Sequence, residues 1–233
     1  TALGNLGNAL RRQGSVGEAE DCYRNALSIA PNDGLRVRLA TLLPVIAGST
    51  EELTSARRNV EASVDALLSD DIHIDDPISE VGATNFHLSY HDSNNRRLNV
   101  KIAQLFSHAC PTLNFIAPHC LREEQSRGRR VKIGFISRNL RDHAVGWCYH
   151  RLIRNLPKGS FEVLAITFDG KDDAVWGAIS DSVDKAIVVP SNLRSAQEAV
   201  AREELDVLIY TDIGLDPTTY FLSFARLAPI QCV

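Results

Sequence analysis

The second half of the chain alternates short apolar runs with stretches of helical periodicity, and this alternation limits the fold more than any other feature. Four runs rich in β-branched residues cover 131–137, 161–168, 184–189 and 206–211. Strands separated by helices form a parallel sheet, because parallel neighbours need a crossover connection. A further strand is predicted from Ile230, after a proline. The sequence therefore predicts an open α/β sheet.

Two helix starts in this half carry capping signals. Ser195 with Glu198 three residues later has the form of a capping box. Asp216 followed by Pro217 is typical of an N-cap with proline at the first helical position. Both signals predict a crossover helix.

Residues 1–31 have the pattern of two short antiparallel helices. Small residues at Gly7 and Ala26 allow the helices to approach closely, and Tyr23 with neighbouring leucines fills the space between them. This pattern is typical of a tetratricopeptide, a repeat of about 34 residues. One repeat further on, Pro44 stands where the first repeat has a leucine, so no second repeat in register is predicted.

The sequence predicts three regions. Residues 1–76 are predicted as the tetratricopeptide repeat with capping helices, ending in an acidic, proline-bounded linker at 70–77. Residues 77–125 are predicted as a helical linker, and 126–233 as the α/β domain, because the run 122–130 is highly charged and precedes the first strand.

We expect the chain to be a piece of a longer protein. A single repeat cannot bury its own outer faces, which favours further repeats before it. The sequence contains no methionine and ends within the strand predicted from Ile230.

Composition excludes several classes of protein. Lys and Arg number 25 against 29 Asp and Glu, so the net charge of −4 gives no electrostatic reason to expect a nucleic-acid or membrane partner. No stretch approaches the ~18 apolar residues of a membrane span. Five scattered cysteines without a signal peptide indicate a reducing compartment, and we expect a cytoplasmic protein.

Ligands of an open parallel sheet bind at the carboxyl ends of the strands, so the loops that follow the strands are the candidate site. These loops are 137–143, 169–172, 190–192 and 212–216. His143 begins the helix after the first strand, roughly opposite an apolar stripe that includes Cys148, Leu152 and Ile153. It is a candidate catalytic residue, and the alternative is an ordinary surface histidine.

The loop after the fourth strand supplies two further candidates. Asp212 and Asp216 flank Gly214 at a strand end, where ligand contacts are common. Capping alone explains Asp216. Asp212 and Gly214 are therefore the predicted substrate-binding residues.

Other chemistries lack their signatures. No Gly-x-Gly-x-x-Gly follows the first strand, which disfavours a dinucleotide cofactor, and there is no phosphate loop or Gly-x-Ser-x-Gly turn. His108, Cys110, His119 and Cys120 do not have the paired spacing of structural zinc sites. No cofactor and no metal are expected.

Several segments together resemble the tetratricopeptide-linked O-GlcNAc transferase family, including its SPINDLY branch. The segments are 130–137, 143–146, 205–212 and 224–231. The run Phe-Ala-Arg-x-Ala-Pro-Ile-Gln at 224–231 is the most specific of them. Residues 86–91, 94–104 and 109–111 resemble the helical entry to the catalytic region of bacterial members.

The resemblance implies a GT-B glycosyltransferase with two Rossmann-like lobes that enclose a nucleotide sugar, while the repeats present a protein acceptor. Residues 126–233 match the first lobe only. The implied reaction transfers GlcNAc from UDP-GlcNAc to Ser or Thr. His143 matches a histidine at the family's reaction centre, which is proposed to act as a base or as a donor contact. The second lobe mainly binds the diphosphate, so we expect the chain alone to be inactive.

Two departures from the family keep alternatives open. Ala144 stands where many members have proline, and 213–215 reads Ile-Gly-Leu instead of a Gly-His-Thr type turn. The second departure leaves the sugar undecided between GlcNAc and another such as fucose. It also allows a non-catalytic adaptor, in which the repeats bind protein and the Rossmann-like lobe is degenerate.

Overall fold

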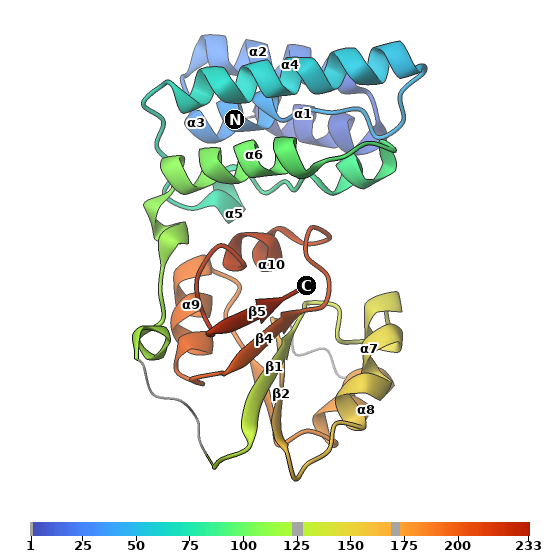
Figure 1. Ribbon diagram of the computed structural model, residues 1–233. Helices are drawn as coiled ribbons and strands as arrows, with labels where there is room; N and C mark the ends of the chain where they lie inside the picture. Colours follow the sequence, from blue (N-terminus) through green and yellow to red (C-terminus); the bar gives the residue numbers. More distant parts are fainter. Residues whose placement is uncertain (1, 123–127, 169–172) are drawn as a thin grey trace. The chain divides into compact units, whose positions relative to one another are not determined.

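The computed structural model describes residues 2–122, 128–168 and 173–233 (Figure 1). The chain forms two compact units, residues 1–111 and 112–233. The first is helical and the second is built on a parallel sheet. The predicted combination of an α region and an α/β region is confirmed.

The first unit consists of helices joined by short connections. Their bounds are α1 Ala2–Gln13, α2 Val16–Ile29, α3 Asp33–Ala40, α4 Thr50–Leu68, α5 Pro77–Glu80, the 3₁₀ helix η1 Phe86–Tyr90, and α6 Arg96–Ala109.

Helices α1 and α2 pack as the predicted antiparallel pair. A Cβ atom on Gly7 would lie 2.5 Å from Cε1 of Tyr23, so only glycine allows this approach. The Tyr23 ring is fully buried, and its hydroxyl donates a hydrogen bond to Oδ1 of Asn8 at 2.8 Å. Burial raises the pKa of the Tyr23 hydroxyl. The small and large positions read from the sequence therefore form the interior of this pair.

The helical pattern of 33–76 is interrupted. Helix α3 ends at Ala40, because Pro44 cannot continue a helix, and α4 begins after Ser49, whose Oγ accepts a hydrogen bond from the amide of Glu52 at 3.1 Å. The acidic segment 70–77 is not a free linker. Ile72 and Ile74 are buried within the first unit.

The expected linker 77–125 divides between the two units. Helix α6 packs against α4, and Lys101 on α6 forms ion pairs with Glu61 at 2.8 Å and Asp65 at 2.7 Å on α4. The units therefore part between Pro111 and Thr112 and not at 126. Residue 126 itself lies outside the described residues. The 3₁₀ helices η2 (Pro111–Asn114) and η3 (Pro118–Leu121) follow this boundary.

The second unit has a five-stranded, all-parallel sheet in the order β3-β2-β1-β4-β5. The strands are β1 Val131–Ile136, β2 Phe161–Thr167, β3 Lys185–Val188, β4 Val207–Tyr210 and β5 Ile230–Cys232. The connecting helices are α7 Ala144–Arg154, α8 Ala174–Ser180, α9 Leu193–Ala201 and α10 Pro217–Leu222.

Helices cover both faces of this sheet. The chain moves outward from β1 to β3 through α7 and α8, then returns to β4 through α9, and right-handed crossovers therefore place α9 on the opposite face (Figure 1). Phe135 and Val163 pack under α7 and α8. On the other face a Cβ atom on Gly134 would meet Leu205, so the sheet is closely packed on that side as well.

The buried face of α7 differs from the predicted stripe. Ile153 is buried, as expected, but Cys148 is exposed and Leu152 is 51% exposed. Leu156 packs against the core, as the predicted stripe requires, and Tyr149 packs there in place of Cys148 and Leu152. The helix is rotated by about one residue relative to the prediction. It begins close to the preceding loop, because a Cβ atom on Gly146 would collide with the carbonyl oxygen of Arg141.

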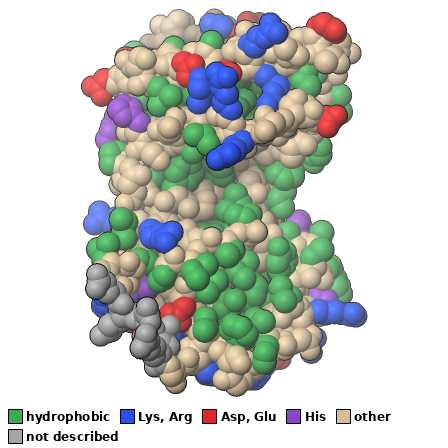
Figure 2. Space-filling view, in the orientation of Figure 1, with side chains coloured by type: hydrophobic (Ala, Val, Ile, Leu, Met, Phe, Trp, Pro, Cys, Tyr) green, Lys and Arg blue, Asp and Glu red, His purple; other side chains and the backbone are tan. Residues whose placement is uncertain are grey.

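Part of one sheet face has few side chains over it. Val207 and Ile209 of β4 pair with Ile230 and Cys232 of β5 and share a face with them. Ile230 is 56% exposed. Figure 2 shows hydrophobic side chains gathered over the strands of the second unit. Among the described residues, no helix is long and apolar enough to span a membrane.

Candidate functional site

The candidate site lies where the order of the strands reverses. β1 has β2 on one side and β4 on the other, so the loops that leave β1 and β4 at their carboxyl ends run in opposite directions. Ile136 and Tyr210 are register partners at the ends of these strands. The residues that follow them therefore meet at one edge of the sheet.

Asp212 ties these two loops together. The residue is 6% exposed, and its Oδ2 accepts hydrogen bonds from Oγ of Ser137 at 2.7 Å and from Nδ2 of Asn139 at 2.8 Å. The Ser137 hydroxyl also accepts a hydrogen bond from the Asn139 amide at 2.7 Å. Oδ1 of Asp212 is buried and has no hydrogen-bond partner among the described residues. Among the described residues, only one of the two carboxylate oxygens of Asp212 therefore accepts hydrogen bonds.

The surroundings of Asp212 oppose its ionisation. Burial raises the pKa of the carboxyl group, and the nearby charge of Asp216 acts in the same direction. The hydrogen bonds from Ser137 and Asn139 and the proximity of His143 lower this pKa by less. Desolvation is the largest influence, which is unusual for a carboxyl group at the open edge of a sheet.

Gly214 and Asp216 shape the rest of the β4 loop. Gly214 is buried and has φ +96°, a left-handed conformation that favours glycine. Oδ1 of Asp216 accepts hydrogen bonds from the amides of Thr218 at 2.9 Å and Thr219 at 3.2 Å, and Pro217 follows it. The predicted N-cap is confirmed.

Arg138 connects loops from three strands. Its guanidinium lies 3.2 Å from Oδ2 of Asp216 and donates hydrogen bonds to Oγ of Ser191 at 3.2 Å and Oγ1 of Thr218 at 3.1 Å. It also lies over the ring of Phe168, 5.5 Å from the centroid. A cation at the strand ends is thus fixed by an ion pair, hydroxyls and an aromatic ring.

His143 caps α7. Its Nδ1 accepts a hydrogen bond from the amide of Val145 at 3.2 Å, and the side chain is half-buried. A ring nitrogen that accepts a hydrogen bond carries no proton, so the neutral ring in this position has its proton on Nε2. His143 therefore presents a hydrogen-bond donor at Nε2 and no vacant acceptor.

Trp147 lies one helical turn after His143. It is 58% exposed, and its Nε1 donates a hydrogen bond to Oδ1 of Asp142 at 2.9 Å. Its ring meets the His150 ring edge-on, with 5.6 Å between the centroids. Residues four apart on a helix share a face, so a fixed, exposed aromatic ring lies beside His143.

Some of the residues predicted from the sequence lie together at this edge of the sheet. The structure places His143, Asp212 and Gly214 in loops at the same edge of the sheet. The loop 137–143 was predicted at this edge, but Ser137, Arg138 and Asn139 were not singled out within it, and Trp147 was missed. Their signal was the polar run directly after an apolar strand, 137–143. The predicted loop 169–172 lies outside the described residues.

Metal ligands do not gather in the part of the chain that the structure describes. No group of three or more His, Cys, Asp or Glu side chains among those residues could hold an ion. His119 and Cys120 are neighbours, but Nε2 of His119 lies 3.1 Å from the carbonyl oxygen of Leu205.

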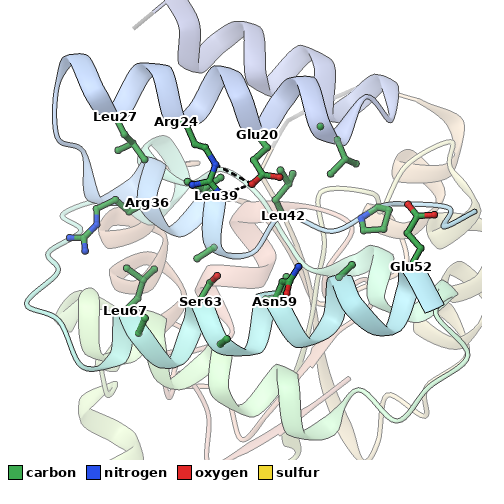
Figure 3. Close-up of a pocket in the computed structure, with 18 residues that line it drawn as sticks. Glu20, Arg24, Leu27, Arg36, Leu39, Leu42, Glu52, Asn59, Ser63 and Leu67 are labelled. Atoms are coloured by element: carbon green, nitrogen blue, oxygen red, sulfur yellow. Dashed lines mark hydrogen bonds and ion pairs between the residues drawn. The ribbon is translucent and has the colours of Figure 1, made fainter. Parts of the chain in front are cut away.

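The first unit has a groove of its own, of about 730 Å³, between α2 and α4 (Figure 3). Leu39 and Leu42 lie between the two helices, and Leu67 lines the wall formed by α4. Glu20 and Arg24 form an ion pair at 2.5 Å on the α2 side. The groove is therefore apolar in its depth and charged at its rim.

Comparisons with known proteins agree with this division. Residues 1–33 match the tetratricopeptide repeat family. No curated protein sequence matches the chain. A solved mutant O-GlcNAc transferase of Thermobaculum terrenum matches with a TM-score of 0.57 and 22% identity, over 99% of this chain and 42% of that one. The chain shares the fold of the matched part of that enzyme. It spans less than half of that enzyme's length, so the likeness describes architecture and not activity.

Proposed function

We propose that this chain is part of a protein O-linked N-acetylglucosaminyltransferase that transfers GlcNAc from UDP-GlcNAc to Ser or Thr of protein acceptors. One observation carries the proposal: the chain matches the fold of an O-GlcNAc transferase over 99% of its length, and its histidine, carboxylate and glycine candidates fall in loops at the switch point of the sheet.

In this proposal His143 donates a hydrogen bond to one of the reacting groups. Its capping bond to the amide of Val145 supports a protonated Nε2, which can donate a hydrogen bond to the acceptor hydroxyl or to a phosphate oxygen. Action as a base would require the ring to leave the cap. Asp212 holds the β1 and β4 loops in register, and Gly214 leaves room for substrate close to the backbone.

The proposal also covers the protein acceptor and the nucleotide-sugar donor. The tetratricopeptide unit presents the protein acceptor, and its groove between α2 and α4 is a surface for such a segment. The donor is a nucleotide sugar, without metal or other cofactor. Groups outside this chain bind the diphosphate, so the chain alone is expected to transfer no sugar. All five cysteines are free thiols, which supports a cytoplasmic location.

The test uses the full-length protein, incubated separately with UDP-GlcNAc and GDP-fucose. Nucleotide release and sugar transfer to lysate proteins are measured for each donor. Transfer from UDP-GlcNAc supports the proposal. Transfer from GDP-fucose alone would mean that the transferred sugar is fucose and not GlcNAc. Neither release nor binding of either donor supports the adaptor alternative, which is favoured by the Ile-Gly-Leu turn at 213–215.

Two variants test the role of His143. His143→Gln retains an amide donor near the position of Nε2 but cannot take up a proton in the reaction. If His143 donates a hydrogen bond, this variant keeps more activity than His143→Ala. Equal loss of activity in both variants contradicts the donor role and favours a base.

A further inference from the structure

A second groove, far along α7 from His143, gathers cationic side chains. It has a volume of about 560 Å³ and is lined by His150, Arg151, Arg154, Asn155, Lys158 and Ser182. Helix α7 runs from the carboxyl end of β1 back to the amino end of β2, so its last turn lies at the opposite edge of the sheet from the candidate site. We define these six residues as the basic groove.

Three separate segments build the basic groove. Arg151 and Arg154 lie in the last turn of α7, where positions three apart share a face. Lys158 comes from the turn before β2, and Ser182 from the turn after α8. Loops distant in sequence therefore converge on one concave surface.

The cations of the groove make no direct ion pair with a described carboxylate. Arg151, Arg154 and Lys158 form no ion pair with any residue in the described part of the chain. Neighbouring cations differ: Arg130 pairs with Asp184 at 2.8 Å, and Lys185 pairs with Glu203 at 2.7 Å.

Acidic groups nearby offset the charge of the groove only in part: the charge of Lys158 contributes to the lowered pKa of Asp184, without a direct ion pair between them. Asp184 already accepts hydrogen bonds from Arg130 at 2.8 Å and from the amide of Val163 at 2.9 Å. Asp181 is exposed in the turn after α8 and forms no ion pair with another described residue. The chain as a whole carries a net charge of −4, so general basicity does not explain this local excess of positive charge.

Helix capping accounts for only part of the cluster. Cations in the last turn of a helix offset the negative end of its dipole, which explains Arg151 and Arg154. Lys158 lies beyond the helix and gains nothing from that effect, because the interaction falls off within the last turn. Lys158 acts on Asp184 at a distance and is exposed, so its ammonium group can also contact a ligand held by the two arginines.

We propose that the basic groove binds phosphate groups, free or carried by a serine or threonine of a partner. Guanidinium groups bind phosphate through paired hydrogen bonds, and an ammonium group adds a mobile charge. Three unpaired cations match a group that carries two or more negative charges. This inference does not rest on the proposed transferase function, because its test measures phosphate binding and not sugar transfer.

The test titrates the purified 233-residue chain with sodium pyrophosphate at constant ionic strength, and NMR follows the arginine Nε–Hε signals. We expect saturable binding with a submillimolar Kd and shifts at Arg151 and Arg154. The double variant Arg151→Gln with Arg154→Gln is expected to raise the Kd by at least about tenfold. Lys158→Gln, which leaves the helix unchanged, raises it separately.

Arg202→Gln is the matched control. Arg202 is also an exposed helix-end arginine in the second unit, without an ion pair to a described residue, and it lies outside the basic groove. Its replacement is expected to leave the Kd within about twofold. Absence of saturation, or an equal loss of affinity in the control, overturns the proposal.

Two further titrations identify the source of the phosphate. One peptide contains phosphoserine, and a second has the same sequence with serine. Binding of the phosphopeptide alone, more tightly than pyrophosphate, supports a phosphorylated protein partner. Binding of pyrophosphate without the phosphopeptide supports a small phosphate ligand. Equal binding of both peptides contradicts phosphate recognition.

Discussion

Each unit of the chain buries a polar side chain at its centre, and the two units complete the hydrogen bonding of that group differently. In the first unit the Tyr23 hydroxyl donates to Asn8 within one helix pair. In the second unit Asp212 receives two hydrogen bonds on Oδ2 and none on Oδ1 from the described residues. Buried polar groups are normally satisfied, and exceptions gather at functional sites. The comparison therefore assigns packing to Tyr23 and function to the surroundings of Asp212.

The largest expected effect tests whether function lies in the second unit. In the full-length protein, His143→Ala is expected to lower kcat/KM for sugar transfer by about a hundredfold or more, because it removes a group at the reaction centre. Transfer is measured with UDP-GlcNAc at equal protein concentration.

His143→Asn separates chemistry from capping. Asparagine is a good N-cap, so this variant keeps the stability of α7 but lacks Nε2, whereas His143→Ala also loses about 1 kcal/mol of stability. Tyr23→Phe in the first unit serves as the control and leaves turnover unchanged. Full activity in His143→Asn contradicts the assignment of His143.

The next effect compares two glycines that permit close packing. A Cβ atom on Gly146 would collide with the backbone carbonyl oxygen of Arg141, whereas one on Gly7 meets the side chain of Tyr23, which can shift. Gly146→Ala is expected to destabilise the second unit by about 3 kcal/mol, and Gly7→Ala the first unit by less. Gly177→Ala in α8 is the control, since its Cβ atom would meet nothing within 4 Å.

Urea unfolding distinguishes the two units. Both tryptophans of the chain, Trp147 and Trp176, lie in the second unit, so tryptophan fluorescence follows that unit alone. Circular dichroism follows the helices of both units, so a change in it that tryptophan fluorescence does not share reports the first unit. If Gly146→Ala and Gly177→Ala unfold at the same urea concentration, the close approach at Gly146 does not determine stability.

Local patterns predicted the elements well, because their physical causes are local. The small residues Gly7 and Ala26 indicated the helix pair, and the Asp216 cap depends only on the residues next to it. The Ser195 cap was wrong. Asn192 caps α9 instead, and its Oδ1 accepts a hydrogen bond from the amide of Ser195 at 2.9 Å. Neighbouring polar residues compete for one cap, and the sequence alone does not decide between them.

The candidate site was less predictable because its contacts are distant in sequence. Ser137 and Asn139 contact Asp212 only because β4 pairs with β1 in the sheet. The order of strands in a sheet cannot be read from the sequence of any one strand. Periodicity also failed on α7, where it favoured Leu152 over Tyr149 as a buried residue. The buried face of that helix is set by its packing against the sheet and α8, which its own periodicity does not specify.

A smaller effect tests whether Tyr23 only packs. Tyr23→Phe removes the hydrogen bond to Asn8 and the contact of the hydroxyl with Arg11, and it keeps the ring. The expected loss is about 1 kcal/mol of unfolding free energy, measured by circular dichroism in urea. Asn8 is half-buried and can recover a water molecule, which keeps the loss small. A loss of several kcal/mol contradicts this, because the hydroxyl would then support more than its own hydrogen bond.

The smallest effect is a pH dependence at Asp212. Because the folded state raises the pKa of this carboxyl group, the unfolded state ionises first as pH rises above about 4. Asp212 therefore costs stability that is absent at low pH and grows toward neutral pH. Asp173 has the opposite sign: hydrogen bonds from the Trp176 and Asp142 amides lower its pKa, so its contribution is present at neutral pH and lost on acidification.

Asp212→Asn isolates this cost. Relative to the parent chain, the variant is expected to gain stability as pH rises above about 4 and to keep a constant advantage once pH passes the raised pKa of Asp212 in the folded state, since all other titrating groups are common to both proteins. Asp173→Asn is expected to have a constant deficit in stability above about pH 4, and this deficit shrinks as pH falls below that value, because the folded-state pKa of Asp173 is lowered. Both differences are measured by tryptophan fluorescence in urea. A stability difference for Asp212→Asn that does not change with pH would mean that the unpartnered oxygen is hydrated, and the contrast with Tyr23 would then disappear.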